Sequence, residues 1–271
     1  MLRFIFLNNR SETFMKTIYI FQMVSIFLSV SAYSQDTITT YMDKDWNEIS
    51  NIDDASYYRK VFFDSSNVWM VHDYFISGNI QMKSPYKSRK LKKQNGKAIY
   101  YFENGQKQSE VSYINDNRNG EYISWYETGE IKQKGTYEKD VRTGSWQGWH
   151  LNGIKSFSKN YSKGKMIGVW NIYYDTGELK EKNTSLSEDA RLCEGFHENG
   201  TMSYSGEIES KMKNKKWIYW NEEGEISLEG DYSYGFKTGI WVRYFKEEKL
   251  ELKYNKGKLE GRQYGGMVRR D

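Results

Sequence analysis

The strongest constraint on this chain is a residue position that returns every 24 residues along most of its length. The units begin, at what we call position zero, with Gly96, Gly120, Gly144, Gly168, Arg191, Lys215 and Gly239. Every interval is 24 residues except the one before Arg191, which is 23. A fixed period of this length marks tandem supersecondary units that stack on their neighbours, so the sequence predicts a repeat architecture.

Three further positions keep the same phase. Position two holds Ala98, Tyr122, Trp146, Trp170, Cys193, Trp217 and Trp241. Position five is always aromatic, with Tyr101, Trp125, Trp149, Tyr173, Phe196, Trp220 and Tyr244. Position nine is glycine in six units, at Gly105, Gly129, Gly153, Gly177, Gly200 and Gly224. A looser copy starts at Trp69 and a truncated stub at Gly261, which gives eight full units.

Each unit has the pattern of one β-hairpin. Residues 169–174 are rich in β-formers, and Asp175-Thr-Gly-Glu178 then places glycine where a turn needs positive φ. A second strand follows, and a looser turn such as residues 162–165 leads to the next unit. We therefore predict an all-β fold, an elongated, twisted meander or solenoid of about eight tandem hairpins that forms a single-layer ribbon.

Rings at the same position of successive units should form ladders, because strands lie ~4.8 Å apart and each hairpin advances the sheet by ~9.6 Å. Positions two and five face opposite sides of a regular strand, so either both faces carry aromatic rows or a bulge brings the rows together. These rings are cross-strand contacts and also candidate stacking sites for a peptide or glycan. The candidates are Trp125, Trp146, Trp149, Trp170, Tyr173, Trp217, Trp220, Trp241 and Tyr244.

The first 34 residues have the layout of a secretory signal peptide. From the candidate initiator Met15, Lys16 supplies a positive start, residues 17–30 an apolar stretch, and Ala32-Tyr33-Ser34 a cleavage pattern. The apolar stretch is shorter than the ~20 residues that span a bilayer. The sequence therefore predicts export to the periplasm or the cell surface.

Residues 35–68 are predicted to cap the repeats, which occupy residues 69–271. Ser56 to Phe63 has strand character, residues 64–67 have turn character, and residues 36–54 are predicted to form a loop or a short helix.

The segment GVWNIYYDTGEL, residues 168–179, resembles the bacterial variant of the MORN repeat. Chains with arrays of this repeat are often described as antitoxin components of the YwqK type. Residues 55–59 and 73–80 are similar to exported proteins of Bacteroidota type that carry the same repeats. The resemblance implies a twisted hairpin ribbon with a protein-binding or scaffolding role, and it implies no catalytic residues.

Catalytic and metal-binding constellations are not expected. His150 and His197 share position six in units two apart, so ~19 Å separates them, whereas zinc ligands lie ~2 Å from one ion. Cys193 and His197 are ~13 Å apart on one strand, beyond the reach of a nucleophile and its base. No phosphate-binding loop, dinucleotide fingerprint or nucleophile elbow occurs. We expect no enzyme, no metal and no cofactor.

One segment breaks the even distribution of charge. Between residues 83 and 97 the chain carries bases and no acid, namely Lys83, Lys87, Arg89, Lys90, Lys92, Lys93 and Lys97. This run is either a solvated connecting loop or a contact for anionic lipid headgroups or an acidic partner. The turns, by contrast, carry the carboxylates Glu103, Glu127, Asp175, Glu198, Glu222 and Glu223, which suit solvation and local hydrogen bonding.

The leading functional hypothesis is an exported, non-enzymatic scaffold in the bacterial envelope that binds a protein partner. An antitoxin or immunity protein that binds a toxin is a second hypothesis, and a module for cell-wall glycan or anionic lipid is a third. A net charge of +4 on 271 residues indicates no nucleic-acid partner.

Overall fold

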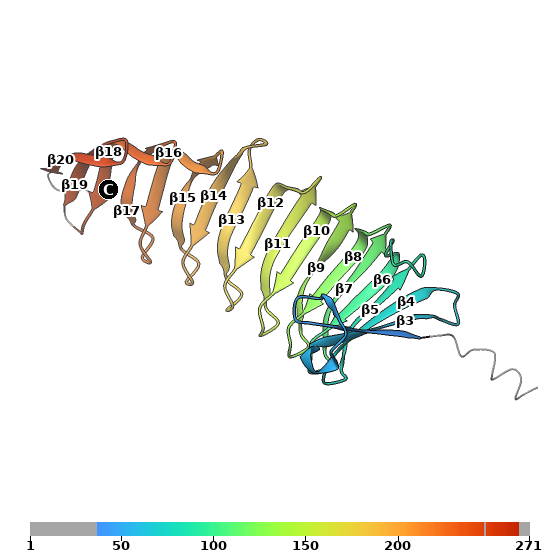
Figure 1. Ribbon diagram of the computed structural model, residues 1–271. Coiled ribbons are helices and arrows are strands. Elements are labelled where there is room, and N and C mark those ends of the chain that lie inside the picture. Colours follow the sequence, from blue (N-terminus) through green and yellow to red (C-terminus); the bar gives the residue numbers. More distant parts are fainter. Residues whose placement is uncertain (1–36, 247, 266–271) are drawn as a thin grey trace, which may run out of the picture.

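The computed structural model describes residues 37–246 and 248–265, and the predicted signal peptide lies outside them. The described residues form one antiparallel sheet of twenty strands, in which each strand pairs with the next along the chain from β3 onward. Figure 1 shows an elongated, twisted ribbon with β3 near one end and β20 at the other. The predicted all-β single-layer meander is confirmed. Among the described residues no helix is long and apolar enough to cross a membrane.

Eight hairpins make up most of the ribbon, one for each sequence unit. The first four are β4 (Trp69–Phe75) with β5 (Ile80–Tyr86), β6 (Gly96–Tyr101) with β7 (Lys107–Ile114), β8 (Asn117–Trp125) with β9 (Ile131–Glu138), and β10 (Val141–Trp149) with β11 (Lys155–Ser162). The last four are β12 (Lys165–Tyr173) with β13 (Leu179–Ser185), β14 (Ala190–Phe196) with β15 (Met202–Glu209), β16 (Met212–Trp220) with β17 (Ile226–Ser233), and β18 (Phe236–Tyr244) with β19 (Lys249–Asn255). The stub forms β20 (Lys258–Gly265).

The turn inside each unit, here called the first turn, uses the position-nine glycine as expected. Gly129 has φ of 102°, its N–H donates to the Tyr126 carbonyl, and the Tyr126 N–H donates to the Glu130 carbonyl. The same hydrogen bonds recur around Gly105, where φ is 85°. Glycine is needed because a side chain disfavours this left-handed backbone.

The turn between units, here called the second turn, is tighter than the looser turn expected from the sequence. In six of these turns two residues with positive φ join directly paired strands, as Lys163 (49°) and Gly164 (80°) do between β11 and β12. This is the type I′ geometry, whose twist matches that of the flanking strands. The expectation was wrong because Lys, Asn, Ser and Tyr also occupy these left-handed positions.

The N-terminal cap contains more strand than expected. Residues 36–54 were expected to form a loop or short helix, but they include β1 (Ile38–Met42), β2 (Glu48–Ile49) and a single 3-10 turn, η2 (Ile52–Asp54). Strand β1 pairs with both β2 and β3 (Tyr57–Phe63), which extends the sheet beyond the first repeat. The predicted strand and turn before the first repeat are present as β3 and residues 64–67.

A partly buried ion pair joins the cap to the first hairpin. Arg59 on β3 donates from Nε and Nη2 to the two carboxylate oxygens of Asp73 on β4, at 2.7 and 2.8 Å. Asp73 is 1% exposed, and its hydrogen bond raises the pKa of Arg59. Such a two-point contact fixes the register of β3 against β4.

Candidate binding face

Positions two and five lie on opposite faces of the sheet, so both faces carry an aromatic row. The face that holds position two, here called the tryptophan face, contains the buried side chains Trp146, Trp217 and Trp241, which are 0–2% exposed. Trp170 is 6% exposed on the same face. These four rings, proposed as candidate binding residues from the sequence, serve as the core of the ribbon and offer no open ring face to a ligand.

Each of the three most buried tryptophans lies over a glycine directly across the sheet. A Cβ atom added to Gly135, Gly206 or Gly230 would lie 2.1–2.3 Å from the ring of Trp146, Trp217 or Trp241, respectively. The indole Nε1 then donates to the carbonyl of the next residue, as Trp217 does to Glu207 at 3.1 Å. The Trp217–Glu207 bond lies where the β15–β16 register shifts. Glycine, tryptophan and bulge therefore form one packing device.

Cations cover the outer side of these rings. Arg142 lies 4.3 Å from the Trp146 ring centre, Lys213 lies 4.2 Å from that of Trp217, and Lys237 lies 4.1 Å from that of Trp241. Burial lowers the pKa of Lys237. Since the ring face attracts a cation, the methylene chains and charges complete the burial of these three tryptophans.

The opposite face carries the position-five row and is the more accessible one. Its rings are half-buried, and none of the seven is fully buried. Lysines from the preceding strands lie over three successive rings, with Lys83 at 5.7 Å from Tyr101, Lys107 at 5.6 Å from Trp125 and Lys134 at 5.4 Å from Trp149. Of the candidate binding rings, those with solvent access are Trp125, Trp149, Tyr173, Trp220 and Tyr244.

Polar groups surround this row. A shallow hollow across β8, β9 and β10 is lined by Ile123, Lys134, Thr136 and Gln147. Farther along, the Tyr244 hydroxyl donates to Glu229 at 2.7 Å, which raises the pKa of Tyr244 to about 12. The face thus combines half-exposed rings with paired charges, and no second layer of described residues packs on it.

His150 and His197 join neighbouring units by hydrogen bonds at the first-turn edge. Nε2 of His150 lies 3.0 Å from the Tyr173 carbonyl, and Nε2 of His197 lies 3.1 Å from the Trp220 carbonyl, in each case in the next unit. Tyr126 and Tyr174 make the same link through their hydroxyls. Tyrosine and histidine can both make this link, because each carries a hydrogen-bond donor at the far end of its ring.

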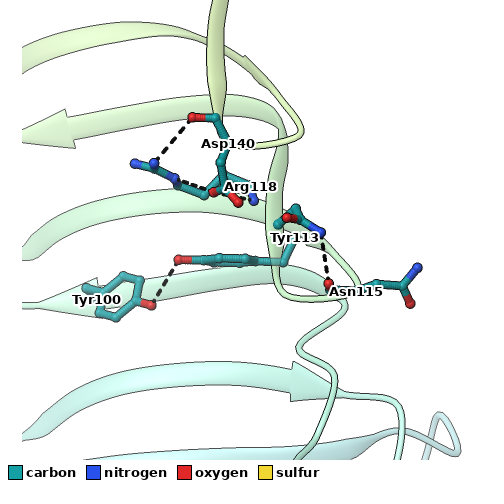
Figure 2. A network of polar contacts seen from close by, with 6 residues as sticks. Tyr100, Tyr113, Asn115, Arg118 and Asp140 are labelled. Atoms are coloured by element: carbon teal, nitrogen blue, oxygen red, sulfur yellow. Dashed lines mark hydrogen bonds and ion pairs between the residues drawn. The ribbon is translucent and has the colours of Figure 1, made fainter.

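A second series of hydrogen bonds joins the units at the second-turn edge. In each of the second turns from β7 to β20 except that of residues 186–189, an N–H donates to a carbonyl of the preceding unit, as Asp140 does to Arg118 and Gly164 does to Arg142. Figure 2 shows the Arg118 side chain also bound to Asp140, with Nε 2.9 Å from the carboxylate, and the hydroxyls of Tyr100 and Tyr113 within 3.5 Å. Neighbouring units are therefore bonded at both edges as well as along their strands.

Cys193 occupies a position-two slot on the tryptophan face. It is 3% exposed, and its Sγ donates to Oδ1 of Asn183 at 3.0 Å. Burial raises the pKa of the Cys193 thiol. Within residues 37–246 and 248–265 no group of three or more His, Cys, Asp and Glu side chains gathers in a way that could hold a metal ion.

The basic run lies mostly in the ordered loop between β5 and β6. Lys87, Arg89, Lys90, Lys92 and Lys93 are exposed there, whereas Lys83 lies on β5 and Lys97 on β6. Lys97 forms an ion pair with Glu110 at 3.3 Å, and Arg89 lies 5.8 Å from the Trp69 ring centre. The structure thus separates two partnered bases at the strands from a group of exposed lysines in the loop.

A search with family models identifies the repeat. Residues 94–115 and 118–139 match the MORN repeat variant. The chain therefore carries two adjacent MORN repeats by sequence, and the structure continues the same hairpin on both sides of them. MORN repeats are generally non-catalytic modules, and they typically bind proteins or membranes. No curated protein matches the chain.

The residues that sequence reasoning missed are Gly135, Gly206 and Gly230. They stand at position fifteen of their units, and each precedes a position-two tryptophan of the following unit by eleven residues. The glycines at positions zero and nine mark turns, whereas those at position fifteen lie within strands. The signal that marks them in the sequence is a glycine eleven residues before a tryptophan, which places the two on neighbouring strands.

Proposed function

We propose that this protein is an exported, non-enzymatic scaffold of the bacterial envelope that binds a protein partner through the face carrying the position-five row. The observation that supports this function is the difference in exposure between the two faces of the sheet. The tryptophan face is filled by its own side chains, whereas the opposite face presents half-exposed rings along the ribbon. Aromatic side chains flanked by charges are typical of protein interfaces.

A protein partner suits this face better than a glycan does. Lysines lie over Tyr101, Trp125 and Trp149 and occupy space that a sugar ring would need for stacking. A protein surface with carboxylates can pair with those lysines and pack against the ring edges at once. Export rests on the pattern of residues 15–34, and membership among YwqK-type antitoxins remains a prediction from the resemblance.

The test is partner capture from the cell envelope with a variant in which Trp125, Trp149 and Trp220 are replaced by serine. The full chain should retain one stoichiometric protein, and the variant should lose it at least tenfold. The control replaces Tyr234 and Phe236, which are 74% and 56% exposed at the second-turn edge, and should bind as the full chain does.

Circular dichroism establishes that both variants are folded before capture is compared. Equal capture by the two variants would contradict binding through the position-five face. Recovery of the uncut chain from the cytoplasm alone would contradict export. If the captured protein is a toxin that the full chain inactivates, the scaffold is an immunity protein.

A further inference from the structure

Exposed charges of opposite sign gather in the two sets of turns, although the second turns also hold the carboxylates Asp116, Asp140, Glu188 and Asp189. The first turns all lie along one edge, and exposed carboxylates gather there, namely Glu103, Glu127, Glu130, Asp175, Glu178, Glu198, Glu222 and Glu223. The second turns lie along the other edge, together with the loop between β5 and β6. That edge carries the exposed bases Lys87, Lys90, Lys92, Lys93, Lys139, Lys163, Lys211 and Lys256.

The densest positive charge is the basic loop, residues 87–93, and the fold holds it in place. Leu91, with φ of 51°, packs against the buried cluster of Val61, Val71 and Met82. The Lys87 N–H donates to the Lys93 carbonyl at 2.9 Å and closes the loop. The inward leucine leaves the lysines on either side of it exposed to solvent.

Four of these lysines have no ion-pair partner among residues 37–246 and 248–265. They are Lys87, Lys90, Lys92 and Lys93. Natural loops that hold several like charges together without a counter-charge oppose their own folding, because the charges repel one another. The fixed loop is therefore suited to a partner that brings negative charge.

The densest unpaired acidic turn lies far away on the same molecule. Glu222 and Glu223 are adjacent and exposed in the turn between β16 and β17. The basic loop follows β5, so about eleven strand spacings, roughly 50 Å, separate the two along the ribbon, and they lie on opposite edges. No side chain spans that distance, so the two groups cannot neutralise each other within one molecule.

We propose that the basic loop of one copy docks on the acidic first-turn edge of a second copy, centred on Glu222 and Glu223. The occupant is another copy of this chain because both complementary charges belong to it. The loop and the turn are different surfaces, so the contact is heterologous, and in a pair one copy keeps a free turn while the other keeps a free loop. Association therefore runs head to tail and continues with concentration, separately from the partner bound on the position-five face.

The test is sedimentation velocity of the full chain over a range of concentrations at 25 mM and 500 mM salt. The average mass should rise with concentration at low salt and return to that of the monomer at high salt, because the contact is electrostatic. The loop variant K90E/K92E/K93E and the turn variant E222K/E223K should each associate at least tenfold more weakly than the full chain.

Mixing the two variants provides the sharpest readout. The acidic loop of one then meets the basic turn of the other, so the mixture should associate again although neither variant does so alone. The control K163E/K211E/K256E makes the same charge change in second turns away from the loop and should associate as the full chain does.

A chain that stays monomeric at every concentration in 25 mM salt would overturn the proposal. So would association that neither variant weakens. If vesicles of anionic lipid bind the monomeric full chain but do not bind the loop variant, the basic loop is a lipid contact and the proposal is wrong.

Discussion

The neighbouring units that begin at Arg191 and Lys215 fill position two in different ways. In the second, Trp217 lies over Gly206, its Nε1 reaches the Glu207 carbonyl, and Lys215 takes a left-handed backbone with φ of 58°. In the first, Cys193 faces Asn183, and strands β13 and β14 pair without a register shift. Asn183 there accepts hydrogen bonds from Cys193 and Arg191.

The difference in packing at position two goes together with a repeat that is one residue shorter. The unit before Arg191 has 23 residues instead of 24, and its second turn is the longer loop of residues 186–189 in place of a two-residue turn. Without the bulge, the slot opposite position two holds asparagine, whose Cβ occupies the space that an indole would need. In the Arg191 unit, glycine, tryptophan and bulge are therefore all replaced by a polar network. The Trp170 unit is intermediate, because it keeps the tryptophan and the register shift but has Lys159 at position fifteen in place of glycine.

The largest expected effect comes from truncating the position-two side chain to alanine in each of the two units. Trp217→Ala should lower the free energy of unfolding by about 3–5 kcal/mol, because it empties a buried indole site. Cys193→Ala should cost about 1 kcal/mol, since it removes one sulfur atom. Urea unfolding of both variants measures the difference, and equal losses would show that the tryptophan units are not the stronger ones.

A smaller effect tests the cradle itself. Gly206→Ala should cost about 1–3 kcal/mol, because its Cβ would lie 2.2 Å from the Trp217 ring. In a Trp217→Ala background the same change should cost less than 1 kcal/mol, since the ring it meets is gone. A double-mutant cycle by urea unfolding gives the coupling. Additive losses would mean that Gly206 acts through the backbone alone.

The reverse change asks whether the Arg191 unit can accept an indole. Cys193→Trp should cost about 1–3 kcal/mol, because the ring meets Asn183 in a buried slot. Adding Asn183→Gly should recover part of that loss, although the bulge is still absent. Thermal unfolding compares the single and double variants. A single variant as stable as the parent would contradict the explanation for the cysteine.

The smallest effect at neutral pH concerns Tyr232, which packs between Trp217 and Trp241, whereas the matching residue of the Arg191 unit is Ile208. Burial raises the pKa of Tyr232 to about 12. Between pH 10 and 12 the unfolded chain releases this proton and the folded chain keeps it, so stability falls as pH rises. Tyr232→Phe should weaken that alkaline loss in melts at pH 8 and pH 11. An unchanged slope would assign the loss to other tyrosines.

Local patterns predicted the hairpins because each signal lies within one unit. The position-nine glycines and the position-five rings are fixed by turn geometry and strand propensity, which neighbouring residues determine. The faces were undecided because the sheet register depends on bulges at position zero, and these involve the strand of another unit. Strand β1 was missed for a related reason, since its pairing with β3 is not visible in residues 38–42 themselves.

The candidate site was predictable only in part. The sequence grouped Trp146 with Trp149 as equal candidates, yet the first is buried and the second half-buried on the other face. Which ring is covered depends on Gly135, eleven residues before Trp146, and this contact crosses from one unit to the next. The basic run was visible in the sequence, whereas the role of Leu91 in fixing the loop requires the packed cluster beneath it.

Hydrogen exchange by mass spectrometry tests most directly whether units with a tryptophan packed over a glycine are more stable than the Arg191 unit, which lacks this pair. Each unit of such a ribbon contacts only its neighbours, so the protection of its amides against exchange reports the local stability of that unit. Among the interior strands, β13 and β14 should exchange fastest, and β16 to β18 should exchange slowest. Uniform protection along the ribbon, or a minimum at the strands around Trp217, would contradict the account.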